Sequence, residues 1–391
     1  MASTLYPQAG LAARTAERAV AVPWYIWCSV LAVTSAMIGG HWDISWHRSI
    51  GRDTFWTPAH IAIYMCGVLA GISCGYLILT TTFDRASELA NSSVRVLGFR
   101  GPLGAFIAAW GGVTMLTSAP FDNWWHDAYG LDVKIVSPPH VVLIMGIFAV
   151  NMGTLVLILG HMNRASEHLR KQFDRLFLYM GGLLVVLLAI LLSEYCLVPL
   201  LHSSSPYVHT AVFIPLVLVG VRWASGQRFA ATWVAGLYTA FLLAVIWILP
   251  LFPAEPKLGP VYVQVTHFVP PNFPVLFVVP AFCLDLIWQR TERLNAWLIA
   301  LLSGVVFVGV LLAVEWPFAA FLNSPASRNW FFGTGDLDYG TSPDSFTARH
   351  LFFMPESALQ FSVWIGISML FATVSTRIGI AWGQWMKRIR R

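Results

Sequence analysis

Long apolar stretches separated by short polar segments dominate the chain. A helix needs about 20 mostly apolar residues to cross a bilayer. The pattern predicts ten spans, near residues 24–42, 57–82, 102–121, 137–160, 173–199, 207–222, 228–252, 270–289, 294–320 and 358–383. We therefore expect an all-α polytopic membrane protein, with about ten transmembrane helices arranged as five outward-facing helical hairpins. The first span is expected to be a retained helix rather than a cleaved signal peptide.

Composition supports the same class. Hydrophobic residues make up 57% of the chain and charged residues only 11%, whereas soluble domains contain about 25% charged residues. The mean hydropathy is +0.67. These values exclude an ordinary soluble domain and indicate the lipid bilayer as the main partner.

The basic residues predict an orientation. With ten spans, 18 of the 24 Lys and Arg residues fall at the end of the bundle that holds both termini. The positive-inside rule then places both termini in the cytoplasm of a bacterial-type inner (cytoplasmic) membrane, with residues 1–23 as a cytoplasmic segment. These Lys and Arg residues at the cytoplasmic end account for the net charge of +5. No nucleic-acid partner is expected.

One pattern of metal-ligand residues occurs twice. Residues 41–60 read HWDISWHRSIGRDTFWTPAH and residues 121–140 read FDNWWHDAYGLDVKIVSPPH. Each copy has an Asp, a His four residues later and a second His just after a proline. The candidate metal and catalytic residues are Asp43, His47 and His60 in the first copy, and Asp122, His126 and His140 in the second.

The spacing predicts how each set converges. Residues four apart share one helical face, so Asp43 and His47 can face one ion from the outer end of a helix. Thr57-Pro58 and Ser137-Pro138 are typical helix starts, which puts His60 and His140 in the first turn of the next helix. A short hairpin would bring each His back to its Asp/His pair, on the predicted periplasmic side.

Two imidazoles and one carboxylate without a thiolate suit copper, iron(II) or zinc, and leave coordination positions open. Asp53 and Asp132 follow the middle histidines at matching distances. Carboxylates often orient metal-bound histidines, and this is the role we expect for both.

The two motifs resemble the neighbouring copper sites in the C subunit of the copper membrane monooxygenases, the particulate methane and ammonia monooxygenase family. The resemblance covers residues 24–160. It implies one or two copper ions, dioxygen and a small apolar substrate, an external electron donor, and other subunits or a homo-oligomer. That family has Asn where this chain has Asp122.

We expect three parts: the segment 1–23, a C-subunit-like four-helix unit at 24–165, and a six-helix extension at 166–391. The extension would contain a long outer loop at 321–357 and a basic cytoplasmic carboxyl terminus. Its further candidate ligands, also predicted to lie at the outer ends of helices, are His202, His209, His267 and His350.

The functional hypothesis is a membrane-bound copper-dependent monooxygenase, or its metal-binding subunit, that hydroxylates a small apolar substrate. A non-haem iron oxygenase would use the same residues. A third interpretation is a non-catalytic copper-binding or copper-delivery membrane protein.

Overall fold

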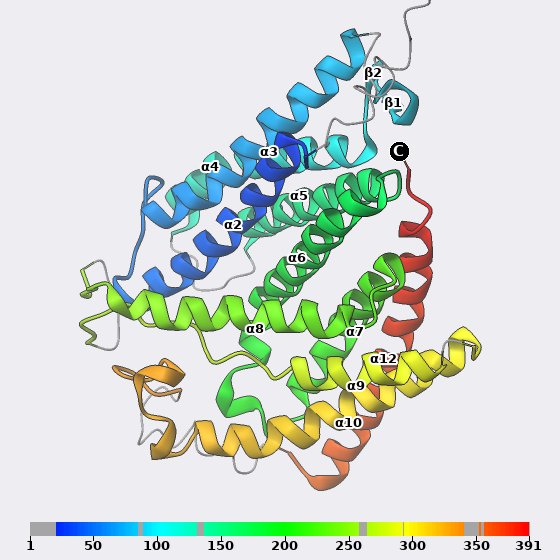
Figure 1. Ribbon diagram of the computed structural model, residues 1–391. Coiled ribbons are helices and arrows are strands. Elements are labelled where there is room, and N and C mark those ends of the chain that lie inside the picture. The colour runs from blue at the N-terminus through cyan, green and yellow to red at the C-terminus, as the bar shows by residue number, and fades with distance from the viewer. Residues whose placement is uncertain are drawn as a thin grey trace, which may run out of the picture.

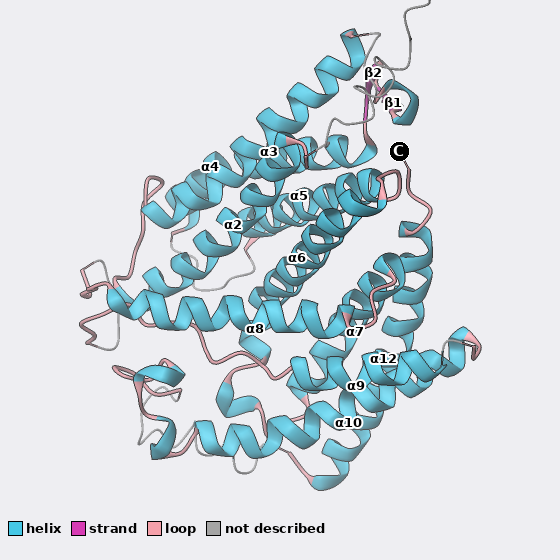
Figure 2. Ribbon diagram, viewed as in Figure 1, coloured by secondary structure: helices cyan, strands magenta, loops and turns pink. Residues whose placement is uncertain are grey.

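The computed structural model describes residues 21–84, 89–130, 137–257, 264–291, 293–339, 352 and 356–390. This part of the chain is almost entirely helical, with ten α-helices and one two-stranded sheet (Figure 1). Figure 2 shows how small the strand content is. The predicted all-α polytopic membrane fold is confirmed.

The first half of the chain forms two hairpins of long helices. Their bounds are α2 Trp24–Ser49, α3 Pro58–Phe83, α4 Leu103–Tyr129 and α5 Pro138–Met162. Between α3 and α4 lie the 3-10 turn Ala90–Ser92 and the antiparallel strands β1 Val94–Val96 and β2 Phe99–Gly101. Both α3 and α5 start with proline, which fits because the first N–H of a helix has no partner within the helix.

The second half contributes six helices. They are α6 Glu167–Leu192, α7 Ser205–Ser225, α8 Ala230–Ile248, α9 Val278–Thr291, α10 Ala296–Leu322 and α12 Ala358–Met386. Short 3-10 turns cover Ser193–Tyr195, Val198–Leu200, Leu249–Leu251, Pro325–Ser327 and Trp330–Phe332. In Figure 1, α6 lies between the first-half helices and the group formed by α7, α9, α10 and α12, and it packs against α2, α5, α7 and α8.

Eight of the described helices are long and apolar enough to cross a membrane. The helix α2 has 26 residues but falls outside this set by composition, because it begins with aromatic residues and contains His41. The helix α9 has only 14 residues. The predicted span at 270–289 becomes helical at Val278 because Pro270, Pro271 and Pro274 lack the N–H groups that a helix requires.

Two buried acids accept hydrogen bonds from backbone N–H groups, one in the segment before α9 and one at the start of α8. Glu315 of α10 accepts the Leu276 N–H at 2.9 Å, and its side chain is 2% exposed. Asp285 of α9 is fully buried and accepts both the N–H and the hydroxyl of Thr232, in the first turn of α8. An unpaired buried N–H is costly, so these carboxylates hold α8, α9 and α10 together.

Close backbone contact joins α4 to α5, the two helices that carry the second motif. A Cβ atom on Gly104 would lie 2.3 Å from the Leu157 backbone nitrogen and 2.4 Å from the Gly153 oxygen. Small residues commonly allow such close approach between membrane helices. The interface therefore requires glycine at this position.

The substitution Gly104→Ala is expected to destabilise the protein by about 1–3 kcal/mol, because backbone atoms would have to move apart. Thermal unfolding in detergent measures the effect. Gly71→Ala on α3 is the matched control, since a Cβ there meets no atom within 4 Å. Equal melting temperatures for the two variants would contradict the proposed packing constraint.

Candidate metal centres

The end of α2 and the start of α3 bring the first motif together. Asp43 and His47 lie one turn apart on α2, with His47 Nε2 3.8 Å from Asp43 Oδ2. His60 lies in the first turn of α3, and its Nε2 is 3.3 Å from Asp43 Oδ1. The structure thus places all three motif residues in one cluster.

Asp53, which the sequence suggested only as an orienting group, lies inside this cluster. Its Oδ2 is 2.7 Å from His60 Nε2 and 3.4 Å from His47 Nε2. One donor atom from each of Asp43, Asp53 and His60 lies within 4.8 Å of the others, close enough to share one metal ion. His47 lies outside this tightest set, and its side chain is 47% exposed against 15% for His60.

The loop between α2 and α3 directs Asp53 inward. Gly51 has a φ of +105°, a conformation that residues with a Cβ rarely adopt. Beyond Asp53, the Thr54 N–H donates to Thr57 Oγ1 at 2.8 Å, and the Thr57 N–H donates to Thr54 O at 2.9 Å. This turn leads into α3, so the position of Asp53 depends on backbone geometry that residue spacing does not reveal.

The charge balance at Asp53 follows from its neighbours. Burial raises the pKa of Asp53, but hydrogen bonds and positive charge from His47 and His60 outweigh burial and hold that pKa well below its usual value. The carboxylate is therefore ionised at neutral pH. Metal binding requires this ionised carboxylate together with histidines that have released their protons.

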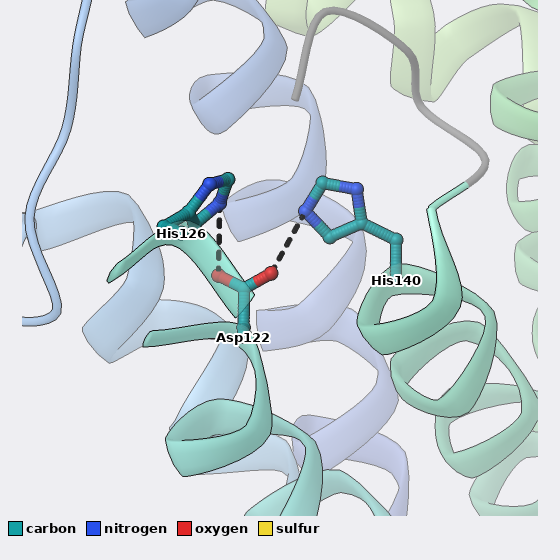
Figure 3. Close-up of side chains that lie close together, drawn as sticks. All are labelled: Asp122, His126 and His140. Atoms are coloured by element: carbon teal, nitrogen blue, oxygen red, sulfur yellow. Dashed lines mark ion pairs between the residues drawn. The ribbon is translucent and has the colours of Figure 1, made fainter. Parts of the chain in front are cut away.

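The second motif forms a similar cluster between α4 and α5 (Figure 3). Asp122 and His126 lie one turn apart on α4, with His126 Nε2 3.6 Å from Asp122 Oδ2. His140, in the first turn of α5, has its Nε2 3.4 Å from Asp122 Oδ1. One donor atom from each residue lies within 4.8 Å of the others.

The geometry of the second cluster fits one metal ion held by all three residues. Asp122 Oδ1 is buried and faces His140 Nε2, yet it has no hydrogen-bond partner among the described residues. His126 Nδ1 lies 3.1 Å from Gly130 O, which leaves its Nε2 on the side of Asp122. Hydrogen bonding of one ring nitrogen is the usual way to orient a metal-binding histidine. Asp132, the other predicted orienting group, lies outside the described residues.

The two clusters lie within electrostatic range of each other. Asp122 of the second interacts with His60 and Asp53 of the first. Tyr64, one turn after His60 on α3, is within range of the carboxylates of Asp122, Asp53 and Asp43. Its ring centroid is 6.0 Å from that of His60. The sequence did not single out Tyr64, although its position four residues after His60 puts it on the same helical face.

The second half of the chain forms hydrogen bonds with the end of α2. The Ser49 hydroxyl accepts the Val269 N–H at 2.8 Å, and the Ser45 hydroxyl donates to Val269 O at 2.7 Å. Arg48 donates to Pro270 O at 3.0 Å. These three residues flank His47, so the extended segment before α9 holds the turn that carries a candidate ligand.

The other candidate histidines join no metal cluster among the described residues. The His202 ring stacks on Trp316 at 4.1 Å, and the His209 ring stacks on Tyr195 at 3.8 Å. His350 lies outside the described residues. Aromatic stacking explains the positions of His202 and His209 without a metal.

His267 lines a separate pocket. Its Nδ1 lies 3.7 Å from Asp336 Oδ2 and 2.9 Å from the Thr266 hydroxyl. Apolar residues such as Phe268 and Trp330 form much of the remaining wall. Only His267 and Asp336 offer strong metal donors in this lining, so the pocket is a weaker candidate than either cluster.

Comparison with protein-family models, curated proteins and solved structures gives no match to this chain. The resemblance to the copper membrane monooxygenases therefore remains a prediction from the two motifs. The candidate sites stand on their own geometry.

The substitution Asp53→Asn is expected to lower metal affinity at the first cluster by more than about 100-fold. Loss of an orienting group costs only about 10- to 100-fold, so a larger loss identifies a direct ligand. Copper titration against a coloured chelator measures the affinity. Asp127→Asn is the control, because this exposed carboxylate on α4 belongs to neither cluster. A loss of about 100-fold or less for Asp53→Asn would show that Asp53 only orients the histidines and is not a direct ligand.

Proposed function

We propose that this protein is a membrane-bound copper-dependent monooxygenase, or the metal-binding subunit of one, which uses dioxygen to hydroxylate a small apolar substrate. One observation carries the proposal: two Asp/His clusters lie at the ends of neighbouring helical hairpins, which pack against each other through α3 and α4. Two redox-active metal ions in one chain would together supply more than one electron.

The donor atoms fit copper. Imidazole nitrogens with carboxylate oxygens are suitable ligands, and copper(II) binds such sites more tightly than the other common divalent metals. Among the described residues the second cluster has three donors, and three donors leave positions open for a reactant. Bound copper would supply the redox chemistry with dioxygen.

The protein surroundings favour apolar substrates and limit water. The side chains of Asp43, Asp53 and His60 are between 14% and 21% exposed. The aromatic rings of Phe55 and Tyr64 pack against each other beside the first cluster, with centroids 5.2 Å apart. Exclusion of water protects reactive species from side reactions, and a small apolar molecule can reach such a site from the lipid phase.

The proposed orientation has both termini in the cytoplasm and the clusters toward the periplasm, as the distribution of basic residues suggests. The chain has no haem-attachment or flavin motif, so we propose that the electrons come from an external donor. Other subunits or further copies of the chain complete the proposed enzyme.

An iron oxygenase is the second candidate, and Asp53 is the observation that favours it. The second cluster has the two histidines and one carboxylate used by many non-haem iron oxygenases. With Asp53, the first cluster offers two carboxylates as well as two imidazoles, and the added hard oxygen donor suits iron(II). Copper remains first because copper(II) binds nitrogen and oxygen donor sites more tightly than iron(II) does.

The test is the metal content of the purified full-length chain, measured by mass spectrometry, together with dioxygen uptake and product formation from a short alkane. We expect about two copper ions per chain. His126→Ala should remove one ion, because three donors are reduced to two, and should lower product formation at least 100-fold. His47→Ala should weaken the first site.

The matched control is His209→Ala, since this histidine stacks on Tyr195 and belongs to neither cluster. Unchanged metal content in both His126→Ala and His47→Ala would refute both sites. Iron in place of copper would support the second candidate. Bound copper without dioxygen uptake, even with a reductant and candidate partner subunits present, would indicate a copper-binding or delivery protein.

A further inference from the structure

A second kind of site lies at the opposite end of α2 from the metal clusters. A cleft of about 430 Å³ opens between the start of α2 and the first turns of α6. One wall carries the cationic residues Lys171 and Arg175 together with His168. These residues follow one another at intervals of three and four along α6, so they share one face of the helix.

No acidic group among the described residues neutralises the positive charges in this cleft. Among the described residues, neither Lys171 nor Arg175 has an ion pair or a side-chain hydrogen bond, and no acidic residue lines the cleft. The neighbouring carboxylate of Asp174 is buried and accepts a hydrogen bond from Gln227 at 3.1 Å. Within the described part of the chain, the cleft therefore presents two exposed cations that have no anionic partner.

The other wall of the cleft is apolar. Val22, just before α2, is buried, and the Trp27 side chain on α2 is 47% exposed and lines the same cleft. Leu176 of α6 adds a buried apolar residue beside the cationic wall. Tryptophan is enriched where membrane proteins meet the boundary between lipid and water. A ligand that fills this cleft would place an anionic group on α6 and an apolar part along Trp27.

We propose that the cleft binds an anionic phospholipid, with the head-group phosphate on Lys171 and Arg175 and an acyl chain along Trp27. The cleft lies between the starting turns of two membrane helices, at the end where the positive-inside pattern gathers Lys and Arg. Basic pockets between helices at this level are suited to lipid head groups. The site is independent of the proposed metal chemistry.

The test uses the full-length chain, stripped of lipid in detergent and titrated with phosphatidylglycerol or phosphatidylcholine, with native mass spectrometry as the readout. The protein should prefer phosphatidylglycerol. The double variant Lys171→Gln, Arg175→Gln should weaken phosphatidylglycerol binding roughly thirtyfold, since each cation near a charged lipid surface contributes about fivefold. Lys387→Gln, Arg388→Gln is the matched control, because both residues are exposed at the same end of the bundle.

Two further measurements separate lipid from a free anion. Trp27→Ala should weaken phosphatidylglycerol binding but leave weak binding of inorganic phosphate unchanged. Equal affinity for inorganic phosphate and phosphatidylglycerol would overturn the lipid assignment, as would equal losses in the Lys171/Arg175 and Lys387/Arg388 variants. Unchanged melting temperatures without added lipid confirm that the exposed substitutions leave the fold intact.

Discussion

Backbone N–H and C=O groups in the apolar part of a bilayer need partners within the protein, and the fold depends on this constraint. Helices meet it by themselves. The extended segment before α9 cannot, so side chains on three helices supply the bonds: Ser49 to Val269, Tyr238 to Val275 and Glu315 to Leu276. An irregular stretch is thereby held firmly, and α2, α8 and α10 become linked through it.

The same constraint explains where the polar chemistry lies. A charge in the middle of a span is expensive, whereas the last turns of α2 and α4 can carry Asp and His side chains that face the next helix. The extended segment contacts the turn of α2 that contains His47 through Ser45, Arg48 and Ser49. The second half of the chain thus supports a candidate ligand that the first half supplies.

Residue spacing predicted those parts of the molecule that follow helical geometry. Asp43 and His47, like Asp122 and His126, share a helical face because they are four residues apart. The inward position of Asp53 depends on the backbone of a loop that contains Gly51, for which spacing gives no signal. The span expected at 270–289 was wrong in its first part, although its prolines were a visible warning.

Two motifs that look alike in sequence have produced clusters whose described residues differ in charge. With neutral imidazoles, the described residues Asp43 and Asp53 give the first cluster two negative charges, while in the described part of the second cluster Asp122 gives one. More carboxylate stabilises a higher metal charge, because each oxygen donor offsets part of it. If both clusters bind the same metal, the first should favour its oxidised state more strongly than the second. Electrons would then collect at the second cluster, which has three donors among the described residues.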